Sequence, residues 1–473
     1  MRLLRTIAFY LFLVVFLVSC PLIVLYALGY VFQPGAERGI VKTGLIHLSS
    51  VPPGASVYVG KRRYTKQTPT SLSDLFPGDY PISVAIKNHR PWVGMVPVEA
   101  EKATALDHLL LLPQQWNWEV RSGGAFEELT PIPGSRVFLL RYGPRLDDHV
   151  VYDGKEDSYR PLSSLGSPSG ARVLSCLTAR GSPSVLLRIE SSKGERWLWV
   201  EFRGEDMRAE DLTSLFPRRP LRVEWDPVEK RQLFTFQDGS LNRLDVASRA
   251  IYPRMVEHVR GYGLFEKSIY VLRDDHVFLR IDHEGGHGDV LVDDPLLSRR
   301  LEGLRGFVDI RVFSKDTILF LGEKGEVLTA QPPYDLVERG VLGLEWDPQR
   351  ERVLLWQKER LGILETARGV TKGDSAAPAP RVQWVFTEGN AIQQAFWVYE
   401  GSHLLFRDGD RVFLLELEPY GASRLHELLQ VQRNSAVLYS EESGTLYFLE
   451  RAAGKLCSME ILPKRELLAL PFP

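Results

Sequence analysis

The amino-terminal part of the chain contains its longest run without charge. Residues 7–32 include no Asp, Glu, Lys or Arg, two arginines precede them, and the next basic residue is Arg38. A helix over these 26 residues rises about 39 Å, more than the roughly 30 Å of a bilayer hydrocarbon core. The positive-inside rule then places residues 1–6 in the cytoplasm. The pattern predicts a transmembrane helix over residues 7–32 and a linker over residues 33–43, with the bulk of the chain outside the cytoplasm.

Two other interpretations of this segment stay open. One is a cleaved secretory signal, whose apolar region normally has roughly 7–15 residues. The other starts from Leu17-Val18-Ser19-Cys20, which resembles a bacterial lipobox and implies a lipoprotein anchored at Cys20 after cleavage. All three interpretations deliver the bulk of the chain to the same side of a bacterial-type cytoplasmic membrane. We expect a single-pass protein, because no second apolar run of spanning length follows.

Residues 44–113 alternate between apolar and polar positions in short segments that are separated by Gly and Pro. This period of two is typical of half-buried strands, and no helical period interrupts it. The segment is therefore expected to be a compact antiparallel β-sandwich without helices. The clearest strands are residues 45–50, 56–59, 82–86 and 92–98.

Four short motifs occur in order along this segment. They are Pro53-Gly54-Ala55, Val57-Tyr58-Val59, Thr68-Pro69 and Pro77-Gly78-Asp79-Tyr80. Together they resemble the PEGA domain. The resemblance implies an extracytoplasmic β module of bacterial and archaeal envelope proteins, which serves as a spacer or an interaction domain.

The rest of the chain repeats one pattern, a short apolar strand followed by a polar turn. Glu224-Trp225-Asp226-Pro227 recurs as Glu345-Trp346-Asp347-Pro348, 121 positions later, which fits three repeats of about 40 residues. A four-stranded blade buries both of its faces only when other blades stack on it radially. We therefore predict a β-propeller over residues 117–473, preferably of seven blades of about 45–50 residues, with six or eight allowed.

The propeller segment is similar in style to the WD40 and YVTN-like propellers of secreted bacterial proteins, and a tandem of β-sandwiches is the alternative. Helical periodicity is confined to Pro295–Leu304 and Tyr420–Leu429. The predicted fold class is all-β: a transmembrane helix, a PEGA-like sandwich and a propeller.

Charge and cysteine content narrow the function classes. The 58 Lys and Arg nearly balance the 60 Asp and Glu, so the chain as a whole has no attraction for nucleic acid. Three cysteines exclude a dense disulfide scaffold and a multi-cysteine zinc site. Whether Cys176 and Cys457 pair with each other stays open.

One string matches a catalytic motif. His283-Glu284-Gly285-Gly286-His287 has the H-E-x-x-H spacing, in which a helix presents two zinc-binding histidines and a catalytic Glu on one face. Two glycines oppose a helix here, and strands flank the string on both sides. We expect a hairpin loop, with His283, Glu284 and His287 as weak metal candidates and no resident cofactor.

These patterns favour binding over catalysis. The expected protein is a membrane-anchored envelope protein whose sandwich is a stalk and whose propeller is a platform for a protein, peptide or glycan partner. A propeller hydrolase or lyase with its site at the central channel is the alternative from another class. A mechanical spacer is the third.

Overall fold

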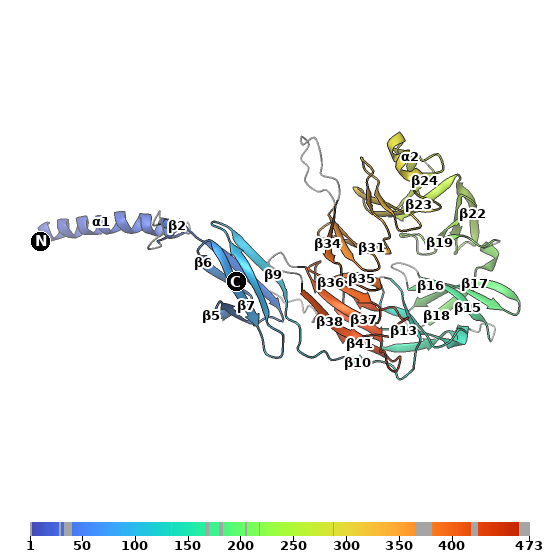
Figure 1. Cartoon of the computed structure of the whole chain (residues 1–473), viewed down its shortest axis with the longest axis horizontal. Helices are drawn as coiled ribbons and strands as arrows, with labels where there is room; N and C mark the ends of the chain where they lie inside the picture. Colours follow the sequence, from blue (N-terminus) through green and yellow to red (C-terminus); the bar gives the residue numbers. More distant parts are fainter. Residues whose placement is uncertain are drawn as a thin grey trace. The chain divides into compact units, whose positions relative to one another are not determined.

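The computed structural model shows an almost entirely β protein with one long helix (Figure 1). It describes residues 2–27, 30–32, 40–133, 135–165, 170–178, 183–203, 206–216, 218–286, 288–365, 381–417 and 424–462. The all-β prediction is confirmed. Contacts divide the chain into two compact units: residues 1–117 with 416–424 and 462–473, and Trp118–Leu415 with Leu425–Ile461.

The amino-terminal helix α1 (Arg2–Ala27) is shifted relative to the predicted span of residues 7–32. The last residues of that span form strand β1 (Tyr30–Phe32), which pairs antiparallel with β2 (Ile40–Lys42) inside the predicted linker. Over the part of the chain that the structure describes, no helix combines the length and the hydropathy of a membrane span.

Two sheets build the sandwich of the first unit. Their inner faces enclose one apolar core, which includes Leu48, Val57, Ile82, Trp92 and Leu106. The sandwich is not wholly antiparallel as predicted, because β3 pairs in parallel with β9. The first sheet has the order β6 (Thr70–Leu75), β3 (Gly44–Val51), β9 (Ala103–Leu110), and the second has the order β5 (Arg62–Gln67), β4 (Ser56–Val59), β7 (Gly78–Ala85), β8 (Trp92–Val98).

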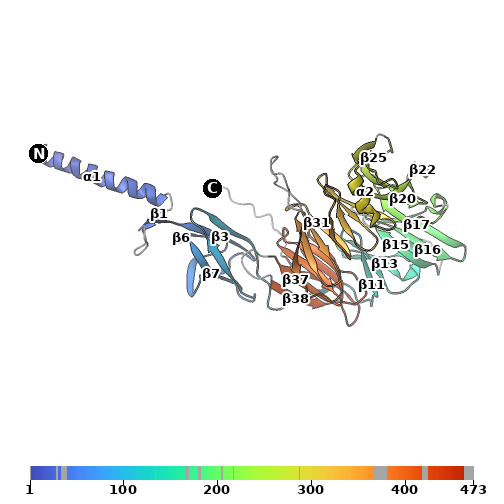
Figure 2. The same cartoon turned by 45° about the horizontal axis from the view of Figure 1, so that its top comes forward.

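Antiparallel four-stranded sets follow one another along the second unit (Figures 1 and 2). Set 1 comprises β11 (Glu128–Pro131), β12 (Val137–Arg141), β13 (His149–Asp153) and β14 (Ser158–Pro161), and set 2 comprises β15 (Arg172–Thr178), β16 (Ser184–Ser191), β17 (Gly194–Arg203) and β18 (Asp206–Asp211). Set 3 comprises β19 (Arg222–Trp225), β20 (Gln232–Gln237), β21 (Ser240–Asp245) and β22 (Ala250–Val256), and set 4 comprises β23 (Val259–Phe265), β24 (Ser268–Arg273), β25 (Phe278–Asp282) and β26 (Gly288–Val292).

Set 5 comprises β27 (Val308–Ser314), β28 (Thr317–Leu321), β29 (Val327–Thr329) and β30 (Leu336–Glu338), and set 6 comprises β31 (Gly343–Asp347), β32 (Arg352–Trp356), β33 (Leu361–Glu365) and β34 (Val382–Phe386). Set 7 comprises β35 (Ile392–Val398), β36 (His403–Asp408), β37 (Arg411–Glu416) and β38 (Arg424–Gln430), and set 8 comprises β39 (Leu438–Ser440), β40 (Thr445–Leu449), β41 (Leu456–Glu460) and β10 (Glu119–Val120).

The sheets give eight sets within the described residues, whereas the spacing of the strands favoured seven and allowed eight. Two features explain the difference. The two copies of the repeated tetrapeptide begin in β19 and β31, which are three sets apart, so the period there is about 40 residues rather than 45–50. In addition, the last set takes its fourth strand, β10, from the beginning of the unit.

Packing between consecutive sets closes the series into a ring. Buried apolar clusters join each of sets 1 to 5 to the next set, and another joins set 8 to set 1. Hydrogen bonds connect set 6 to set 7, where Trp397 Nε1 donates to Glu345 O over 3.2 Å, and set 7 to set 8, where Gln394 Oε1 accepts from Val437 N over 2.9 Å. Each set thereby contacts a neighbouring set on either side, as in a propeller.

Sets 4 and 5 approach so closely that their first strands pair in parallel, Gly261 with Val308. A Cβ atom on Gly261 would lie 2.1 Å from Val308 O, and one on Gly263 would lie 2.0 Å from Ile310 O. Glycine is therefore required on β23 for this approach of two backbones. The pairing identifies the first strands of these sets as neighbours across the set boundary.

The two helix candidates of this unit have different outcomes. Pro295–Leu304 contains α2 (Pro295–Glu302), whose first turn is capped by Asp294 and which buries Leu297 and Leu301. The prediction for Tyr420–Leu429 is wrong, because its described part belongs to strand β38. There the chain gains hydrogen bonds as the outer strand of set 7, which an isolated short helix does not provide.

Candidate functional site

The described part of the string, residues 283–286, forms a turn between β25 and β26, as the flanking strands predicted. Asp282 organises it: its Oδ1 accepts from the backbone N–H of Glu284 over 3.0 Å and of Gly286 over 2.7 Å. The Glu284 side chain is exposed, and His287 lies outside the described residues. The helix that the zinc motif needs is replaced by this turn. Within the described residues, no three His, Cys, Asp or Glu side chains are grouped suitably for a metal ion.

His283 instead contacts a buried carboxylate of the preceding set. Its Nδ1 lies 2.7 Å from Oδ2 of Asp226, whose side chain has no exposed surface. The other oxygen, Oδ1, accepts from the N–H groups of Val228 and Glu229, both at 2.8 Å. Burial alone would raise the pKa of Asp226, but the bonds from His283 and these two N–H groups lower it. The pair ties the turn of set 4 to set 3.

The rest of the His283 ring is enclosed. Its Nε2 atom is buried and has no hydrogen-bond partner among the described residues. The ring meets Phe234 edge to face, with 6.1 Å between centroids. An imidazole in this environment is held in place by Asp226 but presents no ring nitrogen to solvent.

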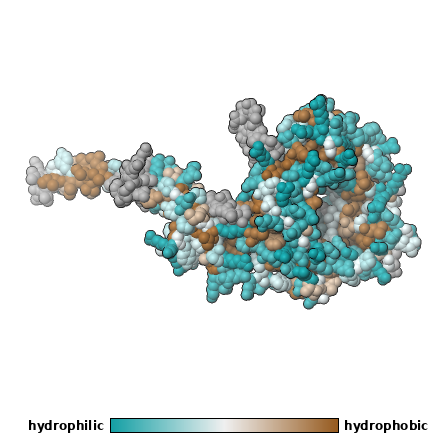
Figure 3. Space-filling model, in the orientation of Figure 1, coloured by the Kyte–Doolittle hydropathy of each residue, from teal (hydrophilic) through white to brown (hydrophobic). Residues whose placement is uncertain are grey.

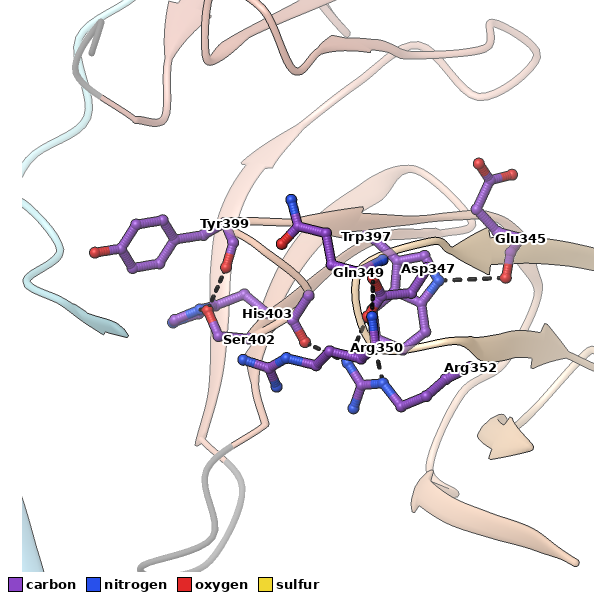
Figure 4. A network of polar contacts seen from close by, with 10 residues as sticks. Glu345, Asp347, Gln349, Arg350, Arg352, Trp397, Tyr399, Ser402 and His403 are labelled. Carbon is purple, nitrogen blue, oxygen red and sulfur yellow. Dashed lines mark hydrogen bonds and ion pairs between the residues drawn. The ribbon is translucent and has the colours of Figure 1, made fainter. Parts of the chain in front are cut away.

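The second copy of the repeated tetrapeptide uses its aspartate in the same way. Oδ1 of Asp347 accepts from the N–H groups of Gln349 and Arg350, at 3.1 and 3.3 Å. Its cationic partner is Arg352 on the adjacent strand, with Nη2 at 2.9 Å from Oδ2 (Figure 4). Both side chains are nearly buried, 4% exposed for the carboxylate and 11% for the guanidinium.

Arg352 also connects set 6 to set 7 (Figure 4). Its Nη2 donates to Gly401 O over 2.7 Å, and its guanidinium lies 4.5 Å from the centre of a Trp397 ring. Gly401 has a φ of +72°, and a Cβ there would lie 2.3 Å from Oδ2 of Asp347. The repeated aspartates therefore have a structural role, which is to fix a turn and hold a basic side chain at a set boundary.

A serine and a histidine lie together in the same turn. Ser402 Oγ donates to Tyr399 O over 2.6 Å and lies 2.8 Å from His403 Nδ1. The two residues are only 7% and 2% exposed. Because the hydroxyl hydrogen is directed to a carbonyl and both groups are buried, this pair lacks the access of a nucleophile and its base.

The first strands of sets 3 and 5 carry the charged groups that matter for a site at a propeller channel. Nη2 of Arg222 lies 2.8 Å from Asp309 Oδ1, and its Nε donates to Glu224 Oε1 over 2.8 Å. Arg311 lies 2.7 Å from the other oxygen of Asp309. Burial alone would lower the pKa of Arg222, but the two carboxylates raise it above its usual range. The acids of this network are neutralised by arginines.

The cysteines are free. Cys457 is on β41 and Cys176 is on β15, and neither is bonded to the other. Burial raises the pKa of Cys176 to about 12 and that of Cys457 to about 11. Neither thiol has the ionised state that a nucleophilic cysteine needs at neutral pH.

The contact between Asp226 and His283 is not visible in the sequence, because 57 residues separate them in the chain. The repeated tetrapeptide and the histidine string therefore look like separate features. The available signal was the repeat itself: an aspartate that recurs before a proline at the start of a strand pair marks a recurring turn.

Comparison with known families identifies the sandwich within the first unit. Residues 43–111 match the model of the PEGA domain, which confirms the resemblance predicted over residues 44–113. No curated protein matches the chain.

Solved structures with similar architecture include β-propellers. The chain is similar to the β-propeller domain of Cps50 (Swd1) from Myceliophteria thermophila, at 12% identity, covering 73% of this chain and 99% of that one, with a TM-score of 0.41. It is similar to the computationally designed Ika8 protein at 11% identity, covering 72% and 97%, with a TM-score of 0.41. The chain is also similar to PorZ, a surface component of the type-IX secretion system of Porphyromonas gingivalis, at 13% identity and with a TM-score of 0.38. This match covers 70% of this chain and 42% of PorZ.

Proposed function

We propose that this protein is a single-pass envelope protein whose eight-bladed propeller binds a partner outside the cytoplasm without catalysing a reaction. The partner is a protein, a peptide or a wall glycan. The PEGA domain serves as the stalk, and the amino-terminal helix is the anchor. The match at residues 43–111 supports a location in the cell envelope, since PEGA domains are expected in proteins that lie outside the cytoplasm.

One observation carries the non-catalytic part of the proposal. The polar residues that could be mistaken for catalytic groups connect neighbouring sets instead. His283 contacts Asp226, and Arg352 contacts Asp347 and Gly401. A general base needs a protonation site that reaches substrate, whereas the second nitrogen of His283 is buried.

The enzyme alternative places a site among the first strands of the sets. There, Glu224 and Asp309 are both within hydrogen-bond distance of Arg222. Both carboxylates are therefore engaged in ion pairs with arginine, and Asp309 pairs with Arg311 as well. These contacts favour binding over hydrolysis or elimination.

The anchor is inferred from sequence and from the surface of α1. Most of its described side chains are apolar and exposed, among them Phe9 at 64%, Leu11 at 66% and Phe12 at 76% (Figure 3). Exposed apolar surface of this extent is unfavourable in water and favourable in hydrocarbon. The arginines at positions 2 and 5 favour an amino terminus on the cytoplasmic side.

Membrane fractionation of the full chain tests the anchor. The wild-type protein is expected to stay in the membrane pellet after carbonate extraction and to be degraded by external protease only once the outer layers are permeabilised. The L13R/V14R variant is expected to move to the soluble fraction, because each arginine costs about 2.5–3.5 kcal/mol at a helix centre. Digestion of the wild type only after lysis of the inner membrane would contradict the orientation.

The Cys20→Ala variant separates the two anchors. A helix anchor predicts unchanged membrane retention and no incorporation of labelled fatty acid. A lipoprotein predicts fatty-acid label on the wild type and its loss in the variant.

Partner capture tests the platform. The full chain, cross-linked in cells and purified in detergent, is expected to bring one stoichiometric envelope partner or wall fragment, without stoichiometric metal by elemental analysis. Release of a soluble product from wall material, abolished by E224Q or D309N, would instead support the enzyme.

A further inference from the structure

Arg407 is a buried cation whose partners are neutral. It lies on β36 and is 4% exposed. Its Nε donates to Gly409 O over 3.0 Å, and its terminal nitrogens donate to Ser435 O and Arg433 O. Three carbonyls thus receive three of the five guanidinium N–H groups. Within the described residues, no carboxylate forms an ion pair with it.

Arg352, which is also buried, is compensated by the opposite charge of Asp347. An ionised group that is removed from water without a counter-charge is strongly unfavourable. Burial lowers the pKa of Arg407 accordingly, and Asp410 opposes the shift only through space. The guanidinium therefore has capacity for an anion that the chain itself does not supply.

This guanidinium lines an open hollow of about 510 Å³. The hollow lies between the first strands of sets 7 and 1 and the loop before β39, and its polar lining includes Thr130, Gln393, Asn434 and Arg433. The lining supplies hydroxyl and amide donors together with a second guanidinium residue.

Among the described residues that line the hollow, Glu128 is the one carboxylate, and it is already paired. Arg141 donates to its Oε2 from Nε at 2.9 Å and from Nη2 at 2.7 Å. Such a two-point pair takes up the charge of the carboxylate. The net charge available to a ligand in the hollow is therefore positive.

We propose that this hollow binds a ligand through an oxyanion group of the phosphate or carboxylate type, held by Arg407 and Arg433 and flanked by Gln393 and Asn434. Arginine is the side chain best suited to this group, because its planar N–H groups match the geometry of two oxygens. The assignment rests on the proposed binding function and names the chemistry that the propeller recognises.

Calorimetric titration of the full chain in detergent tests the site, with inorganic phosphate and with acetate as probes at constant ionic strength. Saturable binding of one equivalent is expected. The Arg433→Gln variant keeps the backbone carbonyl that Arg407 needs, and is expected to bind at least tenfold more weakly. The matched control is Arg218→Gln, which removes an exposed arginine of set 3 and is expected to bind as the wild type does. Arg407→Lys, if its circular dichroism is unchanged, is expected to lose binding as well.

The two probes separate the sources of the oxyanion: preference for phosphate supports a phosphorylated ligand, and preference for acetate supports a carboxylate. Failure of both probes to bind saturably, or equal affinity in R433Q and R218Q, would overturn the assignment. This outcome is independent of partner capture, because the propeller can hold a partner elsewhere on its surface.

Discussion

Replacing Asp347 with alanine removes the centre of the best-defined polar network of the propeller. Arg352, whose side chain is 11% exposed, would keep its charge and lose its only described carboxylate. Breaking a buried ion pair from one side costs about 3–5 kcal/mol. The second unit has about 335 residues, so its unfolding entropy near 60 °C is about 0.7 kcal/mol per degree. The expected fall in melting temperature is therefore about 4–7 °C.

Thermal unfolding followed by tryptophan fluorescence of the full chain in detergent measures this change. The control is Asp289→Ala, which breaks an exposed pair with Arg280 and should cost less than about 1 kcal/mol. The double variant D347A/R352M removes the stranded cation and is expected to regain about 2 kcal/mol relative to D347A. A D347A protein that melts like D289A, or a double variant no more stable than D347A, would refute the argument that the network holds sets 6 and 7 together.

Three further predictions follow from the same contacts. Hydrogen bonds lower the pKa of Asp226 below its ordinary 3.8, so the stability that its carboxylate contributes to the fold is present above that pH and is lost as the pH falls through the folded-state pKa. The D226N variant should therefore lose less stability on acidification than the wild type. An unchanged loss of stability at acid pH in D226N would contradict this prediction. Gly401→Ala should destabilise the protein by about 1–2 kcal/mol or more in urea unfolding, since its φ is +72° and its Cβ meets a carboxylate. In a C20A background, Cys176 and Cys457 should react with a thiol reagent only after unfolding and show no mass change on reduction, because both thiols are free and their pKa values are raised to about 12 and 11.

Strand pattern and turn residues predicted the architecture because they are local properties. Alternation identified the strands of the PEGA domain, and helical periodicity identified the short helix α2. Local pattern failed where pairing with a distant strand decides the structure. Residues 424–429 have a helical period, yet they form the outer strand of set 7. The parallel pairing of β3 with β9 likewise joins segments that are far apart in the chain.

The candidate site was predictable only in part. The glycines of the His283 turn and the strands around it indicated a loop, and this the structure confirms. Its partner Asp226 lies in the preceding set, and the contact depends on how two sets pack. The hollow at Arg407 gives no signal in sequence, because an arginine within an apolar strand is typical of exposed edges, and only the packed structure shows it buried.

The central claim is that His283, although it belongs to a metalloprotease-like string, connects two sets of the propeller through its contact with Asp226. A crystal structure of the protein at about 2 Å, from crystals soaked in zinc, tests it most directly. We predict Nδ1 of His283 within hydrogen-bond distance of Asp226, in two consecutive sets of a closed ring, and no anomalous zinc peak on the ring. A zinc ion bound by His283 together with Glu284 or His287, or a histidine turned away from Asp226 into an open cleft, would contradict the account.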